Sequence, residues 1–379
     1  MTAQRRGRGR GRGQAGMTLV ELMVAVAVVG IVASAMLGVL STGAGLFKDA
    51  EQSADIQGNL RFGTDRMHRD LRNAGLDAPT NAPSDPNVRG GGDANWVGFR
   101  RNPSGLYAFA NAARVSTGHG GANSGFPTES VTVLGNFSNS ARHVVTSVDS
   151  SGVITLQNPA LPSAENIAAA AFAEMYPLGA PVGLQTRNGM FLGNVVGSNY
   201  GGANGPTVTM IPAPAGASAP QGFSGNDATI APLRFMRYSL QTDPADASKT
   251  DLIAEEVNSD GSSPAYARRQ LIAENAVGLR FIFCKDTGFS FGAGLGGANI
   301  VCSAGGPVEP ISTSPEQIRA VRVAIWLRAA QETNYPMPPW ATAALMPEVG
   351  FNVTGGTERL ARVRRLETSV ELPNFLPRY

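Results

Sequence analysis

The hydrophobic residues of this chain follow three patterns, one after another. From Leu19 to Leu40 they form an almost unbroken run, which contains one carboxylate, that of Glu21. A second group recurs at helical spacing: Ile56, Leu60, Met67 and Leu71. After about residue 125, short alternating stretches predict strands. Together these patterns predict an α+β protein. One long N-terminal helix spans a membrane with its first half, and its second half packs on a C-terminal antiparallel β-sheet domain.

The run from Leu19 to Leu40 has the length of a membrane span. Its 22 residues make a helix of about 33 Å, enough to cross a hydrocarbon core of about 30 Å. Five arginines lie within the first twelve residues, directly before the run, and predict that this end stays in the cytoplasm. The run is too long for a secretory signal, and no A-x-A cleavage site follows it.

The strand signals are distributed over the rest of the chain. Residues 130–135 (SVTVLG) predict one strand, and RHVVTSV and GVITLQ predict a hairpin closed by residues 149–152. Ser163 is the expected cap of a short helix that ends before Pro177. A Gly- and Pro-rich connection is expected around 197–225. Four further strands are predicted in the C-terminal part, and the last two are expected to have one solvated face: PLRFMRYSL, NAVGLRFIFC, RAVRVAIWLRA and RRLETSVEL.

Charge gives little indication of a nucleic-acid partner. The chain has 379 residues, and its formal net charge of +2 includes the five arginines at the start. Without them, 26 basic residues remain against 29 acidic ones. The body therefore has no broad basic field, and no nucleic acid is required as a partner.

The sequence predicts no enzyme, no cofactor and no metal site. GAGLGG at 292–297 has the spacing of a dinucleotide motif, but no helix is predicted after it. The three histidines, His68, His119 and His143, are too scattered for a triad. Asp243, Asp246 and Asp251 are candidates for calcium, although their spacing does not match an EF-hand and solvated turn residues are the preferred interpretation.

Two cysteines, Cys284 and Cys302, are separated by 18 positions. If the body lies outside the cytosol, they form a disulfide, which closes a loop and contributes roughly 3 kcal/mol. The alternative is two separate buried thiols.

The stretch AGMTLVELMVAVAVVGIVA resembles the class III signal of type IV pilins and type II secretion pseudopilins. The resemblance implies that prepilin peptidase cuts between Gly16 and Met17 and that the new N-terminus, Met17, is N-methylated. It also implies that the carboxylate of Glu21 pairs with the α-amine of Met17 in a neighbouring subunit during assembly. The first mature residue of the family is usually Phe, and here it is Met17.

A second stretch, IQGNLRFGTDRMHRDLRNAGL, resembles PilW-type minor pilins. The resemblance implies a structural subunit of a priming or tip complex that supports type IV pilus assembly. Its partners would be other minor pilins, the major pilin and the inner-membrane assembly platform, with membrane lipid around Leu19–Leu40. It also implies a single-pass inner-membrane precursor with its head in the periplasm, which later joins a pilus at the cell surface.

The expected organisation has three parts. Residues 1–16 are a cleaved basic leader. Residues 17–76 are the long helix, with a transmembrane part over about 17–40 and an amphipathic part over 41–76. Residues 77–379 are a β-rich head. A processed chain of 363 residues is bulky for a repeating subunit, which favours a minor pilin. A J-type pseudopilin of a type II secretion system is the closest alternative, and a tip adhesin or DNA-uptake module using Gly/Asn-rich loops is another.

Overall fold

The structure is a computed structural model of the chain. It describes these residues: 17–79, 88–90, 99–102, 126–137, 142–157, 169–186, 189–201, 205–211, 228–243, 246, 249–258, 261–286, 300–302, 317–330, 350–351 and 360–373. The chain divides into two compact units, Met1–Ala54 and Asp55–Tyr379. Each unit is described by itself below.

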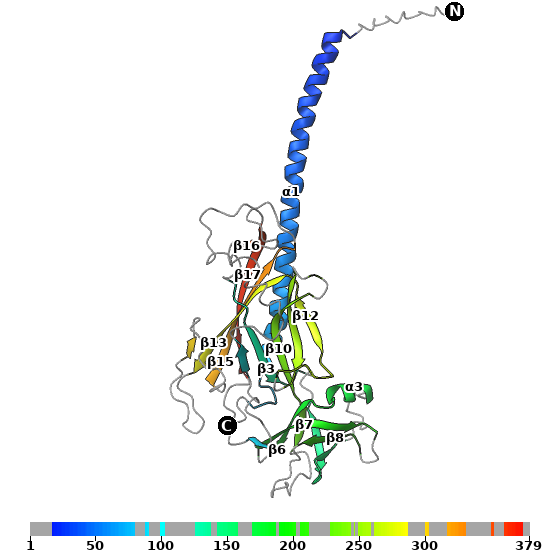
Figure 1. The fold of residues 1–379 in the computed structure, drawn as a ribbon, viewed down its shortest axis with the longest axis vertical. Helices are drawn as coiled ribbons and strands as arrows, with labels where there is room; N and C mark the ends of the chain where they lie inside the picture. Colours follow the sequence, from blue (N-terminus) through cyan, green and yellow to red (C-terminus); the bar gives the residue numbers. More distant parts are fainter. Residues whose placement is uncertain are drawn as a thin grey trace, which may run out of the picture. The chain divides into compact units, whose positions relative to one another are not determined.

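Helix α1 runs from Leu19 to Arg72 (Figure 1). It starts two residues later and ends four residues earlier than the helix predicted over residues 17–76. The chain turns away at Gly75, whose φ of 70° lies in the left-handed region. The amide of Gly75 donates a hydrogen bond to the carbonyl of Leu134 at 2.8 Å, so a strand of the head holds the turn that ends the helix.

Two antiparallel five-stranded sheets form most of the second unit. Sheet 1 contains, in spatial order, β12 (Arg269–Ala273), β11 (Thr250–Val257), β10 (Arg234–Thr242), β3 (Ser130–Gly135) and β2 (Phe99–Asn102). Sheet 2 contains β14 (Ile300–Cys302), β13 (Ala276–Asp286), β15 (Ile318–Arg328), β17 (Ala361–Glu371) and β16 (Gly350–Phe351).

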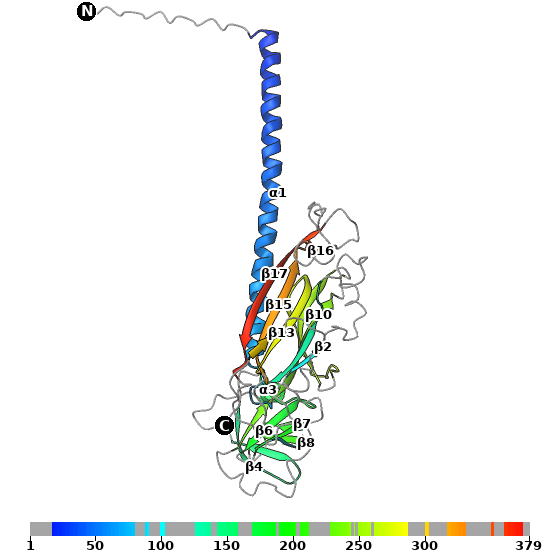
Figure 2. The ribbon, with the colours of Figure 1, turned by 90° about the vertical axis from the view of Figure 1, so that its left-hand side faces the viewer.

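The main hydrophobic core joins the second half of α1 to both sheets. The four apolar helix residues predicted to share a face are all buried in it: Ile56, Leu60, Met67 and Leu71. They pack with inward side chains of β10 and β3 from sheet 1 and of β13, β15 and β17 from sheet 2. Figures 1 and 2 show these strands alongside the lower part of the helix. The predicted α+β fold, a long N-terminal helix followed by a mostly antiparallel β domain, is confirmed.

A closed six-stranded barrel is the part of the fold that the sequence did not indicate. Its strands pair in the order β7, β6, β9, β4, β5 and β8, and β8 pairs back with β7. Their bounds are β4 His143–Val148, β5 Val153–Leu156, β6 Pro181–Thr186, β7 Gly189–Asn199, β8 Thr207–Ile211 and β9 Thr229–Pro232. β1 (Val88–Gly90) adds to β7 in parallel, and helix α3 (Ala169–Met175) contributes Phe172 to the barrel core.

The barrel is inserted at the tip of a hairpin of sheet 1. Gly135, the last residue of β3, lies opposite Arg234, the first residue of β10. The chain therefore leaves sheet 1 after Gly135, forms the barrel, and returns to the neighbouring position. In both views the barrel strands β6 and β7 lie beyond the C-terminal end of α1 (Figures 1 and 2).

Most of the predicted strands are confirmed, and three details were wrong. The hairpin of β4 and β5 is present, with Asp149 Oδ1 accepting hydrogen bonds from the amides of Ser151 (2.8 Å) and Val153 (2.9 Å). The connection expected at 197–225 instead contains the end of β7 and all of β8. The single sheet expected for the head is two sheets and a barrel.

The third error concerns the solvated face of β15. Ala324, Trp326 and Arg328 were expected to face water, but all three are buried. A satellite cluster that includes Phe126, Phe351 and Leu360 covers this half of the strand.

Candidate assembly site at the start of the long helix

The helix begins with a reciprocal hydrogen-bonded cap between Thr18 and Glu21. The hydroxyl oxygen of Thr18 accepts a bond from the amide of Glu21 at 3.3 Å. In return, Oε2 of Glu21 accepts bonds from the amide and from the hydroxyl of Thr18, both at 3.1 Å. This is a capping box, with Thr18 at the N-cap and Glu21 at the third helical position. The spacing T-x-x-E at 18–21 is the sequence signature of this cap, which was not among the predicted features.

The cap leaves part of the carboxylate available. Both bonds from Thr18 go to Oε2, and Oε1 accepts no hydrogen bond within the described residues. A negative charge at this position is also favourable because the exposed amides of a helix start carry partial positive charge. One oxygen of Glu21 therefore stabilises its own helix, while the other can accept a bond from another group.

Met17 is the first described residue, and its side chain is 67% exposed. Gly16 and the rest of the leader lie outside the described residues, so the junction between Gly16 and Met17 stays a prediction. Thr18 directly follows Met17, so an amine created at Met17 would stand one residue before the N-cap.

The apolar surface of this unit is open. All side chains from Met17 to Leu40 are exposed. By length and composition α1 is, among the described helices, the one able to cross a membrane. Two glycines in this stretch are each followed, four residues later, by a hydroxyl that donates to the glycine carbonyl: Ser34 to Gly30 at 2.8 Å and Thr42 to Gly38 at 2.9 Å. The helix is continuous through both positions.

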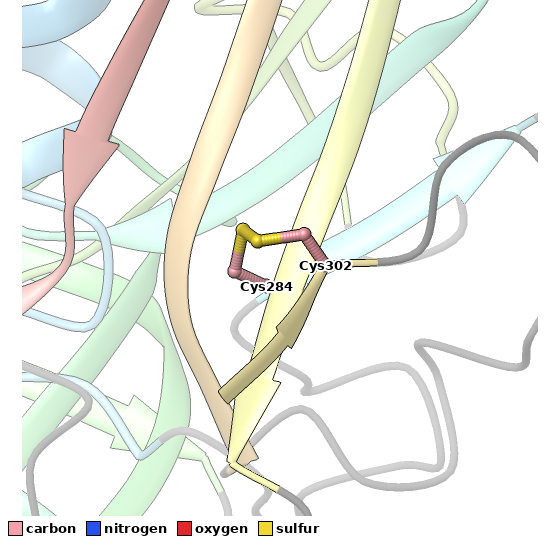
Figure 3. Close-up of a disulfide and its surroundings, with 2 residues drawn as sticks. All are labelled: Cys284 and Cys302. Carbon is pink, nitrogen blue, oxygen red and sulfur yellow. A yellow bond between two sulfur atoms is a disulfide. The ribbon is translucent and has the colours of Figure 1, made fainter. Parts of the chain in front are cut away.

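Cys284 and Cys302 are joined as a disulfide (Figure 3). They lie directly opposite each other on β13 and β14, so the bond fastens the short edge strand β14 to sheet 2. Cys284 is buried, at 3% exposure.

The other candidate residues do not assemble into a site within the described part of the chain. The ammonium of Lys249 lies 3.6 Å from both Asp243 and Asp251 and 3.3 Å from Glu274, so a lysine occupies the place considered for calcium. No group of three metal-ligating side chains is found among the described residues. His68 lies on α1 and His143 in the barrel, while His119 and the motif at 292–297 lie outside the described residues.

Several buried polar contacts were not predicted. The guanidinium of Arg66 pairs with the carboxylate of Asp70 at 3.0 Å. Asp70 is buried and also accepts a 2.6 Å hydrogen bond from the hydroxyl of Tyr238 on β10. Burial, together with the charge of Asp70, raises the pKa of Tyr238 well above its ordinary value. The hydrogen bond between Tyr238 and Asp70 thus links the second half of α1 to sheet 1.

A second contact links the barrel to sheet 1. The guanidinium of Arg234 donates to the carbonyls of Glu174 (3.2 Å) and Met175 (2.7 Å), at the C-terminal end of α3. A cation at this end of a helix satisfies otherwise unbonded carbonyls. The guanidinium of Arg234 also lies 3.6 Å from the carboxylate of Glu256. Burial lowers the pKa of Arg234.

Comparison with known proteins identifies one family feature. Residues 11–37 match the prokaryotic N-terminal methylation motif. The match covers the end of the basic leader, the Gly16–Met17 junction, the capping box and the apolar helix. No curated protein matches the chain.

One solved structure that matches is the crystal structure of a TET aminopeptidase from the marine sediment archaeon Thaumarchaeota archaeon SCGC AB-539-E09. It is 14% identical, and the match covers 33% of this chain and 36% of that chain, with a TM-score of 0.19. The match thus spans about a third of each chain, and a TM-score this low does not indicate a shared fold.

The motif and the long apolar helix support a type IV pilin-like protein, a class that includes the pseudopilins. They support membrane anchoring with a pilus-type location, processing by prepilin peptidase and assembly with other pilins. The motif also points to a structural subunit rather than an enzyme.

Proposed function

We propose that this chain is a PilW-like minor pilin that supports type IV pilus assembly as part of a priming or tip complex. The observation that carries the proposal is the methylation motif at residues 11–37, placed at the start of a helix whose apolar side chains are exposed from Met17 to Leu40. In this proposal prepilin peptidase removes residues 1–16, Met17 becomes the N-methylated N-terminus, and the long helix anchors the precursor in the inner membrane.

The charge distribution supports one orientation of the precursor. The arginines before the apolar run hold that end in the cytoplasm, so the head at 77–379 lies in the periplasm. After assembly the head is at the cell surface. A disulfide between Cys284 and Cys302 fits an oxidising compartment.

Glu21 is proposed to dock one subunit on the next. Its Oε1 is free of hydrogen bonds within the described residues, and its Oε2 is held by Thr18. The α-amine of Met17 in a neighbouring subunit supplies the cation that such a carboxylate requires in a poorly solvated environment. The pairing would set the register between neighbouring helices.

The barrel supports a position at one end of the fibre. It is inserted between two adjacent strands and lies beyond the end of α1 in the head (Figure 2). In a subunit repeated along a thin fibre, such an insertion would have to fit between stacked heads. At the tip of the fibre no further head is stacked on the barrel, so the insertion has no such restriction. The proposed partners are other minor pilins, the major pilin and the inner-membrane assembly platform.

Mass spectrometry of the N-terminal peptide, from membranes and from sheared surface fibres, tests the proposal. A peptide that begins at N-methylated Met17 in the fibre fraction is the expected result. A processed form confined to membranes would favour the J-type pseudopilin instead. An intact leader in a strain with active peptidase would contradict the processing of this chain.

A further inference from the structure

Helix α1 keeps an exposed apolar surface beyond Leu40, where the predicted membrane span ends. Two large apolar side chains lie in the next seven residues: Leu46 is 67% exposed and Phe47 is 79% exposed. Every other side chain from Ser41 to Lys48 is exposed as well. Large apolar side chains left in water lose the stabilisation that burial would give, so this part of the helix calls for a partner.

The distribution of charge extends the membrane span into this stretch. The sequence has no charged residue between Glu21 and Lys48, and these 26 positions make a helix of about 39 Å. At the common tilt of about 20°, it covers about 37 Å along the membrane normal. A hydrocarbon core is about 30 Å thick, and a bilayer with its headgroup regions is about 40–45 Å thick. The charge-free stretch therefore matches the whole bilayer rather than its core alone.

Leu46 and Phe47 continue the apolar face of the span. Each follows an exposed apolar residue by seven positions: Leu46 follows Val39, and Phe47 follows Leu40. Seven residues are close to two helical turns, so the members of each pair lie on the same face. Because α1 is continuous here, the surface that faces lipid at Val39 and Leu40 runs on to Leu46 and Phe47.

The polar groups of residues 41–47 are compatible with lipid. The backbone groups bond within the helix, which is continuous through this stretch. The hydroxyl of Thr42 donates to the carbonyl of Gly38 at 2.9 Å, so this hydroxyl does not require water. Ser41 is the other polar residue of the stretch, and its side chain is small. Charge begins only with Lys48, and two carboxylates follow within the next three positions.

We propose that Leu46 and Phe47 are membrane contacts of the precursor. They lie at the boundary between acyl chains and headgroups, at the end of the span opposite the leader, and Lys48 lies in the adjacent water. The partner is a lipid surface, and the argument is continuity with the membrane span: the same helix face, the same charge-free stretch and an unbroken helix. The inference rests on the proposed function, because it requires the precursor to be anchored in a membrane by α1.

Lipid quenching of a fluorophore on single added cysteines tests the inference. The full-length chain, with its two native cysteines kept in their disulfide, is reconstituted at a high lipid-to-protein ratio. The vesicles are phosphatidylcholine and contain a lipid with spin-labelled acyl chains, which quench a fluorophore that lies in the bilayer. The fluorophore is attached in turn to Leu40→Cys, Phe47→Cys and Phe62→Cys.

Phe62 is the matched control for Phe47. It is a phenylalanine of the same helix, 65% exposed, and it lies 15 positions further along, beyond Lys48. Quenching at position 47 should be within about twofold of quenching at position 40, and roughly tenfold stronger than quenching at position 62.

Three outcomes would overturn the inference. Weak quenching at 47 and 62 with strong quenching at 40 would end the membrane contact near Leu40 and assign Leu46 and Phe47 to a protein partner. Strong quenching at all three positions would show that no boundary lies at Lys48. Weak quenching at all three would contradict the membrane anchoring itself, and with it the proposed function, so the two failures are distinguishable.

Discussion

At the start of α1, the backbone amide and the hydroxyl of Thr18 both donate hydrogen bonds of 3.1 Å to the same carboxylate oxygen of Glu21, Oε2. The carboxylate thus has a local partner before any neighbouring subunit arrives. This relationship separates two roles of Glu21 that a single alanine substitution would confuse, namely capping its own helix and docking on another subunit.

Comparison of Glu21→Gln with Glu21→Ala distinguishes these roles. Glutamine can accept the same capping bonds without a negative charge. If the charge docks a neighbouring amine, both variants should be processed normally, and both should be strongly depleted from sheared fibres by immunoblot. Normal incorporation of Glu21→Gln would show that capping alone is required. Thr18→Val is the complementary control, since it removes the hydroxyl and keeps the charge.

Gly135→Ala should destabilise the head, because a Cβ at this position would clash with the carbonyl oxygen of Asn73. Backbone at the end of α1 cannot move away as a flexible side chain can, so we expect a loss of about 1–3 kcal/mol. Thermal unfolding of the full chain in detergent micelles measures it. Gly201→Ala is the matched control, since nothing lies within 4 Å of a Cβ there. Equal melting temperatures for the two variants would contradict the close approach.

The end of α1 also shows what the sequence could and could not predict. Periodicity placed Ile56, Leu60, Met67 and Leu71 on the buried face, because helical spacing depends on neighbouring residues alone. The barrel was missed because it depends on pairing between strands far apart in the sequence, β5 with β8 across about fifty residues and β4 with β9 across about eighty. Short alternating strands have the same pattern in an open sheet and in a closed barrel.

At the candidate site, the family resemblance predicted the roles of Gly16, Met17 and Glu21. The hydrogen bonds between Glu21 and Thr18 could have been predicted without the resemblance, because the spacing T-x-x-E alone indicates a capping box. The burial of Trp326 could not be read from alternation, since residues far away in the chain, such as Phe126 and Phe351, cover it. The same tertiary packing leaves Arg322 exposed four positions earlier on the same strand.

The disulfide between Cys284 and Cys302 should stabilise the folded head. Replacement of both cysteines by alanine should cost roughly 3 kcal/mol, as expected for a loop of 18 residues. Chemical denaturation of both proteins, with and without reductant, measures the effect. Reductant should destabilise the unsubstituted protein and leave the double variant unchanged. Alkylation of two free thiols in periplasmic material would contradict the bond itself.

The barrel should lose stability in mild acid because of His143. Its ring lies among aromatic side chains, with centroids 5.7 Å from Tyr176 and 6.4 Å from Phe172. Nε2 is buried without a hydrogen-bond partner in the described structure. Burial lowers the pKa of His143 below its ordinary value of 6.5.

The sign of the effect follows from proton binding. Because the folded pKa is lowered, the unfolded chain binds the proton first as the pH falls through about 6.5, and stability declines from there until the folded form is also protonated. His143→Phe should remove this decline, while His68→Gln on α1 should keep it. Hydrogen exchange at β4 and β9, measured between pH 5 and 8, reports opening of this end of the barrel. An identical pH profile for His143→Phe and the unsubstituted protein would assign the decline to other groups.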